Sequence, residues 1–569
     1  MAEKSDKERI DAYMVELGQL EQERNIWEDL WEEAVHYTSP KRDMWADDSG
    51  DADGRGSEDV KKGQDLYDTH AVEAAKIEAN GMVGWNSGPS VKWIKLKLMA
   101  EDMNELPFVK DWLEICERRL YQMLHRSNFY DQLFEFYLDL VTVGTATMLI
   151  EEDPDSMMIN FSTRHPKETY ICEGLNGRVN AAYRQVWYTG QQALDRYGED
   201  LPDKFLEDLQ DPDDKKRLKH LTKKYKFVHV IEKRHGRNTE SALAQDKPIA
   251  SVEFMPEEQE IVRESGYDEM PLIVTRWSKN SNEKYGRSPA MDGLSTIKRM
   301  NQEKLATLKA GHRAVEPPLN IPMEMQRNLD LSPNGANIYK TPERRIYATD
   351  LGRGYPFGKD MLEMLRDEVD NIFMVPLFRM LDRLDRQVTA TEVTERQGER
   401  VAGLAGPLTR QNSEGLGPMI MRIFNIMSRA GLMPAPPPVL AKRGVPLDVE
   451  FTGLLAQAQR RYHQSQSLNA GLAQIHGIVE MAQDPKLLFN LDLDDLIRKI
   501  AETEGFPESS IREMPEVKKM IESYNKQIQE AKQQEQLATG ADAMNKLSKA
   551  PEAGSPAEAV TEQMAGALG

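Results

Sequence analysis

Three stretches of helical periodicity, separated by proline-rich breaks, constrain this chain more than any other feature. Residues 285–434 hold them in order: a long helix, an irregular insert, a second helix, a sharp turn and a third, longer helix. Ser288-Pro289 supplies an N-cap followed by proline at the first helical position, where its missing N–H costs nothing. Apolar spacing then predicts a helix over residues 289–313, which would be roughly 38 Å long at ~1.5 Å per residue.

The insert between the first two helices has no sustained periodicity. Residues 316–358 contain six prolines, which interrupt helical and strand patterns alike. Gly352-x-Gly354 does not indicate a nucleotide-binding loop, because the third glycine falls one place late at Gly358 and no parallel βαβ unit surrounds it. The insert is therefore expected to be largely irregular.

The second and third helices follow from the same periodicity. Residues 358–386 form the second, and Pro376 inside it predicts a bend rather than a terminus, because the apolar period resumes afterwards. Thr389 and Glu392 make a capping box that opens the third helix. Two prolines in that helix, Pro407 and Pro418, predict kinks on the same side.

The N-terminal half predicts helices around an inserted β-rich subdomain. Asn176-Gly177 lies between two strand-like runs and signals a tight hairpin turn. Glycines from Gly81 onward are expected to end the helix predicted over residues 65–85. Helices are predicted at residues 7–37, 65–85, 109–124, 129–143 and, from a capping box at Thr189, 189–197, and strands at 91–98, 227–232, 249–254, 272–277 and 449–455. The fold class is therefore mainly α with an inserted β-rich subdomain, α+β overall.

Length and charge narrow the possible functions. With 569 residues the chain is too long for one hydrophobic core, so several packed units are expected. A formal net charge of -21 argues against holding nucleic acid by bulk charge, although local contact with DNA stays possible. The sequence shows neither a signal-peptide pattern nor an apolar run of about 18 residues, so a soluble protein made in a cytoplasm is expected.

No catalytic, cofactor-binding or metal-binding site is predicted. Residues 51–54 match part of a calcium loop, but Ser49 and Val60 would stand at its first and last ligand positions. The carboxylates of residues 150–155 have no histidine at a useful spacing and are interpreted as a solvated turn around Pro154. Two cysteines permit at most one disulfide and no cysteine-based zinc site. No cofactor is expected.

The first long helix is locally basic in an acidic chain. Residues 284–313 hold seven Lys or Arg against two acids, a local charge of +5. Two interpretations remain open: a basic face toward phosphates, or pairing with acids on neighbouring chains. The residues singled out for either role are Lys298, Arg299, Lys304, Lys309 and Arg313.

Several motifs in a fixed order resemble one protein family. They are Asp68-Thr-His-Ala-Val-Glu-Ala-Ala, Gly81-Met-Val-Gly-Trp, the hairpin with Tyr183-Arg184, Tyr285-Gly-Arg-Ser-Pro, Thr389-Ala-Thr-Glu-Val, and Arg410 with Glu414, Pro418 and Arg429-Ala-Gly-Leu-Met-Pro. Together they cover most of residues 10–455. In this order they resemble the head-to-tail connector, or portal, family of short-tailed bacteriophages.

The resemblance implies a ring, usually of twelve subunits, at one capsid vertex, with wing, stem, clip and crown regions. The regions map to 1–287 (N-terminal helices and β-containing wing), 288–313 (first stem helix), 314–357 (clip), 358–386 (second stem helix), 387–455 (tunnel loop and long kinked wing helix), 456–536 (helical crown) and 537–569 (tail). The tail is rich in small and polar residues, which predicts that it is mobile.

The family also implies partners and a place of action. Double-stranded DNA would pass through the ring without sequence-specific binding, past a tunnel loop whose candidate residues are Arg383, Arg386, Gln387 and Thr389. Expected protein partners are a terminase motor, tail or adaptor proteins, and the major capsid and scaffolding proteins, with assembly in the host cytoplasm and a final place in the virion. The alternatives are a helical scaffold or adaptor without a DNA channel, and a metal-dependent hydrolase.

Overall fold

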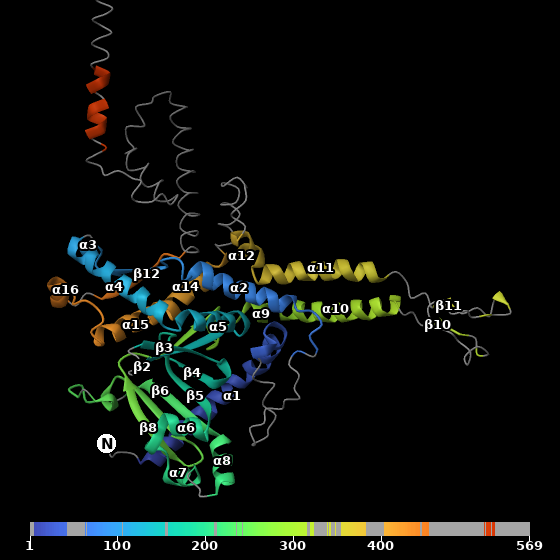
Figure 1. Cartoon of the computed structure of the whole chain (residues 1–569), viewed down its shortest axis with the longest axis horizontal. Helices are drawn as coiled ribbons and strands as arrows, with labels where there is room; N and C mark the ends of the chain where they lie inside the picture. The colour runs from blue at the N-terminus through green and yellow to red at the C-terminus, as the bar shows by residue number, and fades with distance from the viewer. Residues whose placement is uncertain are drawn as a thin grey trace, which may run out of the picture. The chain divides into compact units, whose positions relative to one another are not determined.

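The computed structural model describes most of the first 453 residues (Figure 1). The described ranges are 5–42, 63, 65–104, 106–153, 158–209, 213–234, 236–241, 243–315, 354–382, 403–443 and 446–453, with single residues and short pieces within 319–348 and 517–529. The chain divides into two compact units, Met1–Tyr462 and His463–Gly569. All elements named below belong to the first unit. Its mixture of helices and sheets confirms the α+β class.

Helix α1 (Asp6–Thr38) covers the predicted residues 7–37 as one continuous helix, whereas the periodicity alone allowed either one helix or a pair. Ser5 and Glu8 form a capping box at its start, and it ends two residues before Pro40. Ile10, Leu17 and Leu20 are buried against one face of the larger sheet. Apart from the buried Arg24, the charged residues of the helix are partly or fully exposed, which explains its amphipathic pattern.

Two antiparallel sheets form the β-rich part. The smaller has the order β3-β2-β9 and the larger β4-β5-β6-β7-β8. Their strands are β2 (Thr145–Asp153), β3 (Met158–Arg164), β4 (Thr169–Glu173), β5 (Val179–Thr189), β6 (Lys224–Lys233), β7 (Ile249–Met255), β8 (Glu260–Tyr267) and β9 (Leu272–Arg276). The predicted hairpin joins β4 to β5, with Gly177 at φ 70°. Short helices α6 (Gly190–Tyr197), α7 (Asp203–Leu209) and α8 (Asp214–Thr222) gather at one end of the larger sheet (Figure 1).

The interpretation of residues 150–155 as a solvated turn is wrong for its first half. Glu151, Glu152 and Asp153 belong to β2, where they pair with residues 158–160 of β3. Antiparallel pairing satisfies their backbone groups, so the strand continues into its charged, partly exposed end despite a composition that favours a turn. Pro154 lies outside the described residues.

Two strands far apart in sequence form a small separate ladder. β1 (Ile94–Leu98) pairs with β12 (Leu447–Phe451), which confirms both predicted strands. The outer edge of β1 is closed by side chains of α4 (Pro107–Arg126): the Leu96 N–H donates to Glu117 Oε1 at 2.7 Å, and the Trp93 and Ile94 N–H groups donate to the Tyr121 hydroxyl. These bonds cover an edge that would otherwise be open to pairing with another chain.

Helix α2 (His70–Asn86) packs through small side chains between α1, α5 (Phe129–Thr142) and helices from the second half of the chain. Its Ala71, Ala74, Ala75 and Ala79 are all fully buried. The helix begins five residues later than predicted and ends at Asn86, one residue beyond the predicted end at Trp85, so its end is confirmed. A Cβ at Gly81 would overlap the ring of Phe378, so a close packing contact explains this glycine.

Glu78 stands in the middle of this packed surface. It is fully buried, and neither carboxyl oxygen has a hydrogen-bond partner among the described residues. Burial raises the pKa of Glu78 well above its ordinary value of 4.5. The folded chain therefore keeps this carboxyl protonated at pH values where an exposed glutamate is ionised.

Replacing Glu78 with glutamine is expected to stabilise the chain at neutral pH and to have little effect near pH 4.5. The unfolded chain releases this proton around pH 4.5 and the folded chain retains it, so stability falls as the pH rises above that value. The relative gain for glutamine grows by at most about 1.4 kcal/mol for each pH unit above 4.5, until the buried carboxyl ionises. Thermal melts of both chains at pH 5 and pH 8 measure this difference. Glu73→Gln, on the exposed side of α2, is the control, and an equal shift at both pH values would contradict the assignment.

Candidate functional site

The first long helix begins as predicted but is interrupted once. The Ser288 side chain accepts a hydrogen bond from the Met291 N–H at 3.0 Å, and its hydroxyl donates to the Thr142 carbonyl at 2.8 Å. Helix α9 (Pro289–Asp292) ends at Gly293, and α10 (Leu294–Val315) continues from there. The side chain of Ile372 would lie 3.0 Å from a Cβ at Gly293. The expected unbroken helix over residues 289–313 is therefore wrong at this position.

The second long helix is divided rather than bent. α11 (Gly354–Ile372) starts four residues before the predicted boundary, and α12 (Val375–Asp382) follows after Met374, whose φ is 49°. Pro376 lies in the first turn of α12, where its missing N–H has no partner to lose. The prediction of a bend rather than a terminus is therefore wrong. Residues 383–386 of the predicted helix lie outside the described residues.

α10 and α11 run side by side as an antiparallel pair (Figure 1). Gly358 of α11 meets Thr307 of α10 closely, since a Cβ at position 358 would lie 2.9 Å from the Thr307 hydroxyl. The buried positions of α10 end at Asn301, and from Gln302 onward every side chain of this helix for which burial is described is partly or fully exposed. The second half of α10 is therefore not buried by the described part of its own chain.

The other half of the pair is anchored by polar contacts to the segment that leads into α2. Asn301 accepts hydrogen bonds from the Tyr67 and Asp68 N–H groups at 2.7 and 3.1 Å and donates to the Asp65 carbonyl. Arg366 of α11 donates to Asp68 at 2.8 Å. A hydrogen bond also joins His70 Nε2 to Asp370 Oδ1 at 2.7 Å. Residues of the Asp68 motif therefore hold both helices of the pair.

The basic residues of segment 284–313 divide into two groups. Lys284, Arg287 and Lys298 form ion pairs within the chain, with Glu23, Glu283 and Glu33 respectively. Arg299, Lys304, Lys309 and Arg313 form no ion pair with any residue that the structure describes. Arg299, Lys309 and Arg313 are exposed and recur at a spacing that places them on one side of α10. We call these three residues the basic stripe.

The third helix contains a π-helical segment between two α-helical parts. The parts are α14 (Ala405–Arg410), the segment Gln411–Leu416 and α15 (Gly417–Arg429). The Gly417 N–H reaches back five residues to the Asn412 carbonyl, and Pro418, which cannot donate, follows directly. Pro407 and Pro418, at which kinks were predicted, thus lie on either side of this wider helical turn. The capping box at Thr389 and the start of the predicted helix lie outside the described residues.

Arg276 at the end of β9 fixes this π segment to the β-rich part. It is 1% exposed, and its Nε and Nη2 donate to the two carboxylate oxygens of Glu414 at 3.0 and 2.8 Å. It also donates to the carbonyls of Gly177 and Lys284 and pairs with Glu173. Sequence reasoning noted Glu414 and the hairpin separately but missed Arg276, because no local pattern marks it.

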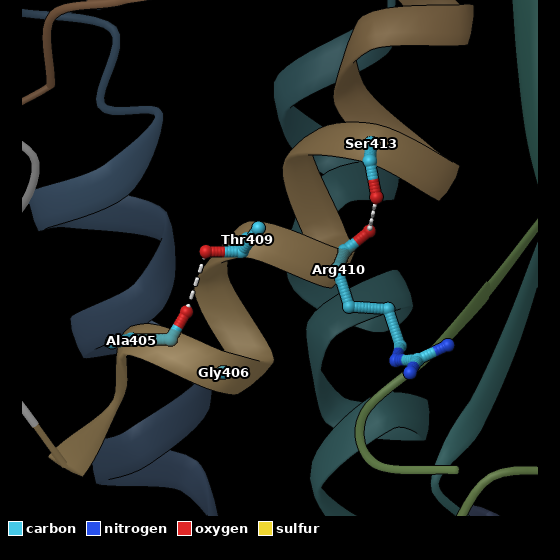
Figure 2. A pocket seen from close by; sticks show the side chains of 5 residues that line it. All are labelled: Ala405, Gly406, Thr409, Arg410 and Ser413. Carbon is cyan, nitrogen blue, oxygen red and sulfur yellow. Dashed lines mark hydrogen bonds between the residues drawn. The ribbon is translucent and has the colours of Figure 1, made fainter.

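An open hollow of about 470 Å³ lies beside α14 and the π segment (Figure 2). Its hydroxyls are already used: Thr409 donates to the Ala405 carbonyl at 2.7 Å and Ser413 to the Arg410 carbonyl at 3.2 Å. Figure 2 shows the Arg410 side chain pointing away from Thr409, and this guanidinium pairs with Glu414. The hollow is therefore lined mainly by small side chains and does not present a set of catalytic or ligand-binding groups.

The remaining predictions about the site concern absences or residues outside the described ranges. Among the described residues no group of three or more His, Cys, Asp or Glu is arranged to hold a metal ion. No helix in the described ranges is long and apolar enough to span a membrane. The tunnel-loop candidates Arg383, Arg386, Gln387 and Thr389 all lie outside these ranges and stay predictions.

Comparison with known proteins identifies similar chains. A family model described as Bacteriophage head to tail connecting protein matches residues 11–511. The chain is 27% identical over 541 residues to the portal protein of Salmonella phage epsilon15, with 93% of each chain covered. It is 28% identical over 557 residues to the probable portal protein of Bordetella phage BPP-1, with 96% of each covered. These similarities extend over nearly the whole chain.

Proposed function

The chain belongs to the bacteriophage head to tail connecting protein family, and its function is that of a phage portal. We propose that it acts as a dodecameric ring at one vertex of the capsid. In this proposal the ring is the channel through which DNA enters and leaves, and it binds a terminase motor first and tail or adaptor proteins afterwards. The role is structural, and the family match is the observation that carries it.

The paired helices support this proposal physically. α10 and α11 are anchored at one end through Asn301, Arg366 and Asp370, and α10 is exposed along its other half. Repeating one such pair around an axis by a head-to-tail contact closes a ring, and the pairs then form its wall. We propose that α10 and α11 are the stem of the portal, that residues 314–357 are the clip, and that residues 456–536 are the crown.

The charge distribution suits passage of DNA rather than retention. Tight binding to phosphates would oppose movement, and a chain of net charge -21 has little capacity for it. The basic stripe on α10 is a local exception to the negative charge of the chain. We propose that it faces either DNA in the channel or acids on the adjacent subunit. The tunnel-loop residues Arg383 and Arg386 would supply further local contacts with DNA.

Reversing the charge of the basic stripe distinguishes these two roles. If Arg299, Lys309 and Arg313 face DNA, replacing all three with glutamate should leave rings intact and reduce the yield of DNA-filled particles several-fold, because a negative channel wall repels phosphates. Electron microscopy of the purified rings and nuclease protection of packaged DNA measure the two effects. Reversing exposed Lys215, Lys216 and Lys219 on α8 is the matched control. Loss of rings by the stripe variant alone would instead assign the stripe to the subunit interface.

Localisation in the particle tests the portal role itself. A gold-labelled antibody against a tag on this chain should mark one vertex of each capsid, and capsids assembled without the chain should contain no DNA. Label at every vertex, or normal packaging without the chain, would contradict the assignment.

A further inference from the structure

The two sheets meet at a corner built by a short connection. β3 ends at Arg164, the 3-10 turn η3 (Pro166–Glu168) follows, and β4 begins at Thr169. Thr169 is paired directly with Arg184 on β5. Arg24 of α1 donates to the carbonyls of Pro166 and Thr169, so α1 closes over this corner.

Four buried hydrogen-bond donors at this corner have no acceptor. They are Nε and Nη2 of Arg184, Nε of Arg164 and the hydroxyl of Thr169, none of which has a partner among the residues that the structure describes. Arg184 is 1% exposed, and the one side-chain hydrogen bond it forms with the described residues goes from Nη1 to Nδ1 of His229 at 3.3 Å. His229 is itself bound to Ser251 through its other nitrogen. Buried donors are nearly always satisfied, so four together call for an acceptor.

The charge at the corner is also uncompensated. Burial and the nearby charge of Arg164 both lower the pKa of Arg184 below its ordinary value. Glu168 and Glu151 act in the opposite direction more weakly, and neither forms an ion pair with Arg184. A buried cation without a paired anion is strongly unfavourable.

The other fully or nearly fully buried arginines show what is missing. Arg24 binds Glu28, Arg276 binds Glu414 and Glu173, and Arg422 binds the Ile150 carbonyl and Glu269. Each of these side chains reaches a carboxylate as well as backbone carbonyls. Arg184 reaches only the neutral ring of His229, whose pKa burial lowers to about 4.

We propose that Arg164, Thr169 and Arg184 bind a compact monovalent inorganic anion of the chloride class. Two guanidinium groups and a hydroxyl supply the positive charge and the donors that such an ion needs. The donor atoms are covered by the protein, which favours a small ion over phosphate or a carboxylate from another chain. Bound there, the ion links β3 of the smaller sheet to β4 and β5 of the larger one and stabilises the join between them.

Thermal melting of the full chain tests this site. The melting temperature is measured in sodium chloride and in sodium gluconate at equal ionic strength and pH, because gluconate is too large to enter. A shift of roughly 2–4 °C in favour of chloride is expected, since a ligand that binds the folded state stabilises it by mass action. The shift should be smaller in Thr169→Val, absent in Arg184→Met, and unchanged in Arg178→Met, an exposed arginine on the same hairpin.

Broadening of the chloride-35 resonance by the protein gives a second readout that does not depend on stability. The wild-type chain and Arg178→Met should broaden the resonance, and Thr169→Val should do so less. Equal melting temperatures in the two salts, or a chloride effect that persists in full in either Thr169→Val or Arg184→Met, would overturn the proposal. If Arg184→Met does not fold, the nearly isosteric Thr169→Val still decides the question.

Discussion

Replacing Arg276 with methionine is expected to lower the free energy of unfolding by about 3–5 kcal/mol, the usual cost of removing one partner from a buried charge network. The substitution keeps most of the side-chain volume, so the loss reports on the charge and its hydrogen bonds. It leaves Glu414 and Glu173 without their buried cation and the carbonyls of Gly177 and Lys284 without a donor. The π segment would lose its tie to β9 and to the hairpin.

A matched variant separates this effect from a simple change of charge. Arg410 pairs with the same Glu414 at 2.8 Å, but its side chain is one-third exposed. Arg410→Met should therefore cost only about 0–1 kcal/mol, as exposed ion pairs do. Urea unfolding followed by tryptophan fluorescence measures both. Equal losses in the two variants would show that Arg276 does not organise the network.

Replacing Gly81 with alanine is the second change with a large expected effect. The added Cβ would overlap the ring of Phe378, which is buried on α12. Overpacking of this kind costs about 1–3 kcal/mol, and the better helix propensity of alanine offsets about 1 kcal/mol at most. The α2–α12 contact should weaken, and protease cleavage near α12 should become faster.

Gly84 provides the control, because it lies in the same helix and a Cβ there meets nothing within 4 Å. Gly84→Ala should stabilise the chain by about 0.5–1 kcal/mol. A second substitution, Phe378→Leu, should restore part of the stability lost in Gly81→Ala, since it removes the overlapping ring. A double-mutant cycle without coupling between positions 81 and 378 would contradict the packing described here.

Local signals predicted the elements that depend on local contacts. The capping box at Thr189, the hairpin at Gly177 and the N-cap at Ser288 are each satisfied within a few residues of sequence, and the structure confirms all three. The prediction failed where a distant contact decides the outcome. Gly293, where the first long helix is interrupted, lies against Ile372 of α11, and Gly415 lies in the π segment against Thr275 of β9.

The candidate site was predictable in outline and not in detail. For the helices predicted over residues 289–313 and 358–386, three of the four ends lie within a few residues of the prediction. The fourth end lies outside the described residues. Some of the ion pairs that shape the site join residues far apart in sequence. Lys298 pairs with Glu33, 265 residues earlier, and Arg276 pairs with Glu414, 138 residues later. No periodicity reveals such pairs, so the exposed basic stripe could be recognised only once the paired cations were identified.

Native mass spectrometry of the purified full chain, with negative-stain imaging of the same sample, tests the central claim most directly. A portal built from α10 and α11 predicts a closed ring with the mass of twelve chains and a central opening in end-on views. A monomer or dimer under every assembly condition, or a ring without an opening, would contradict it.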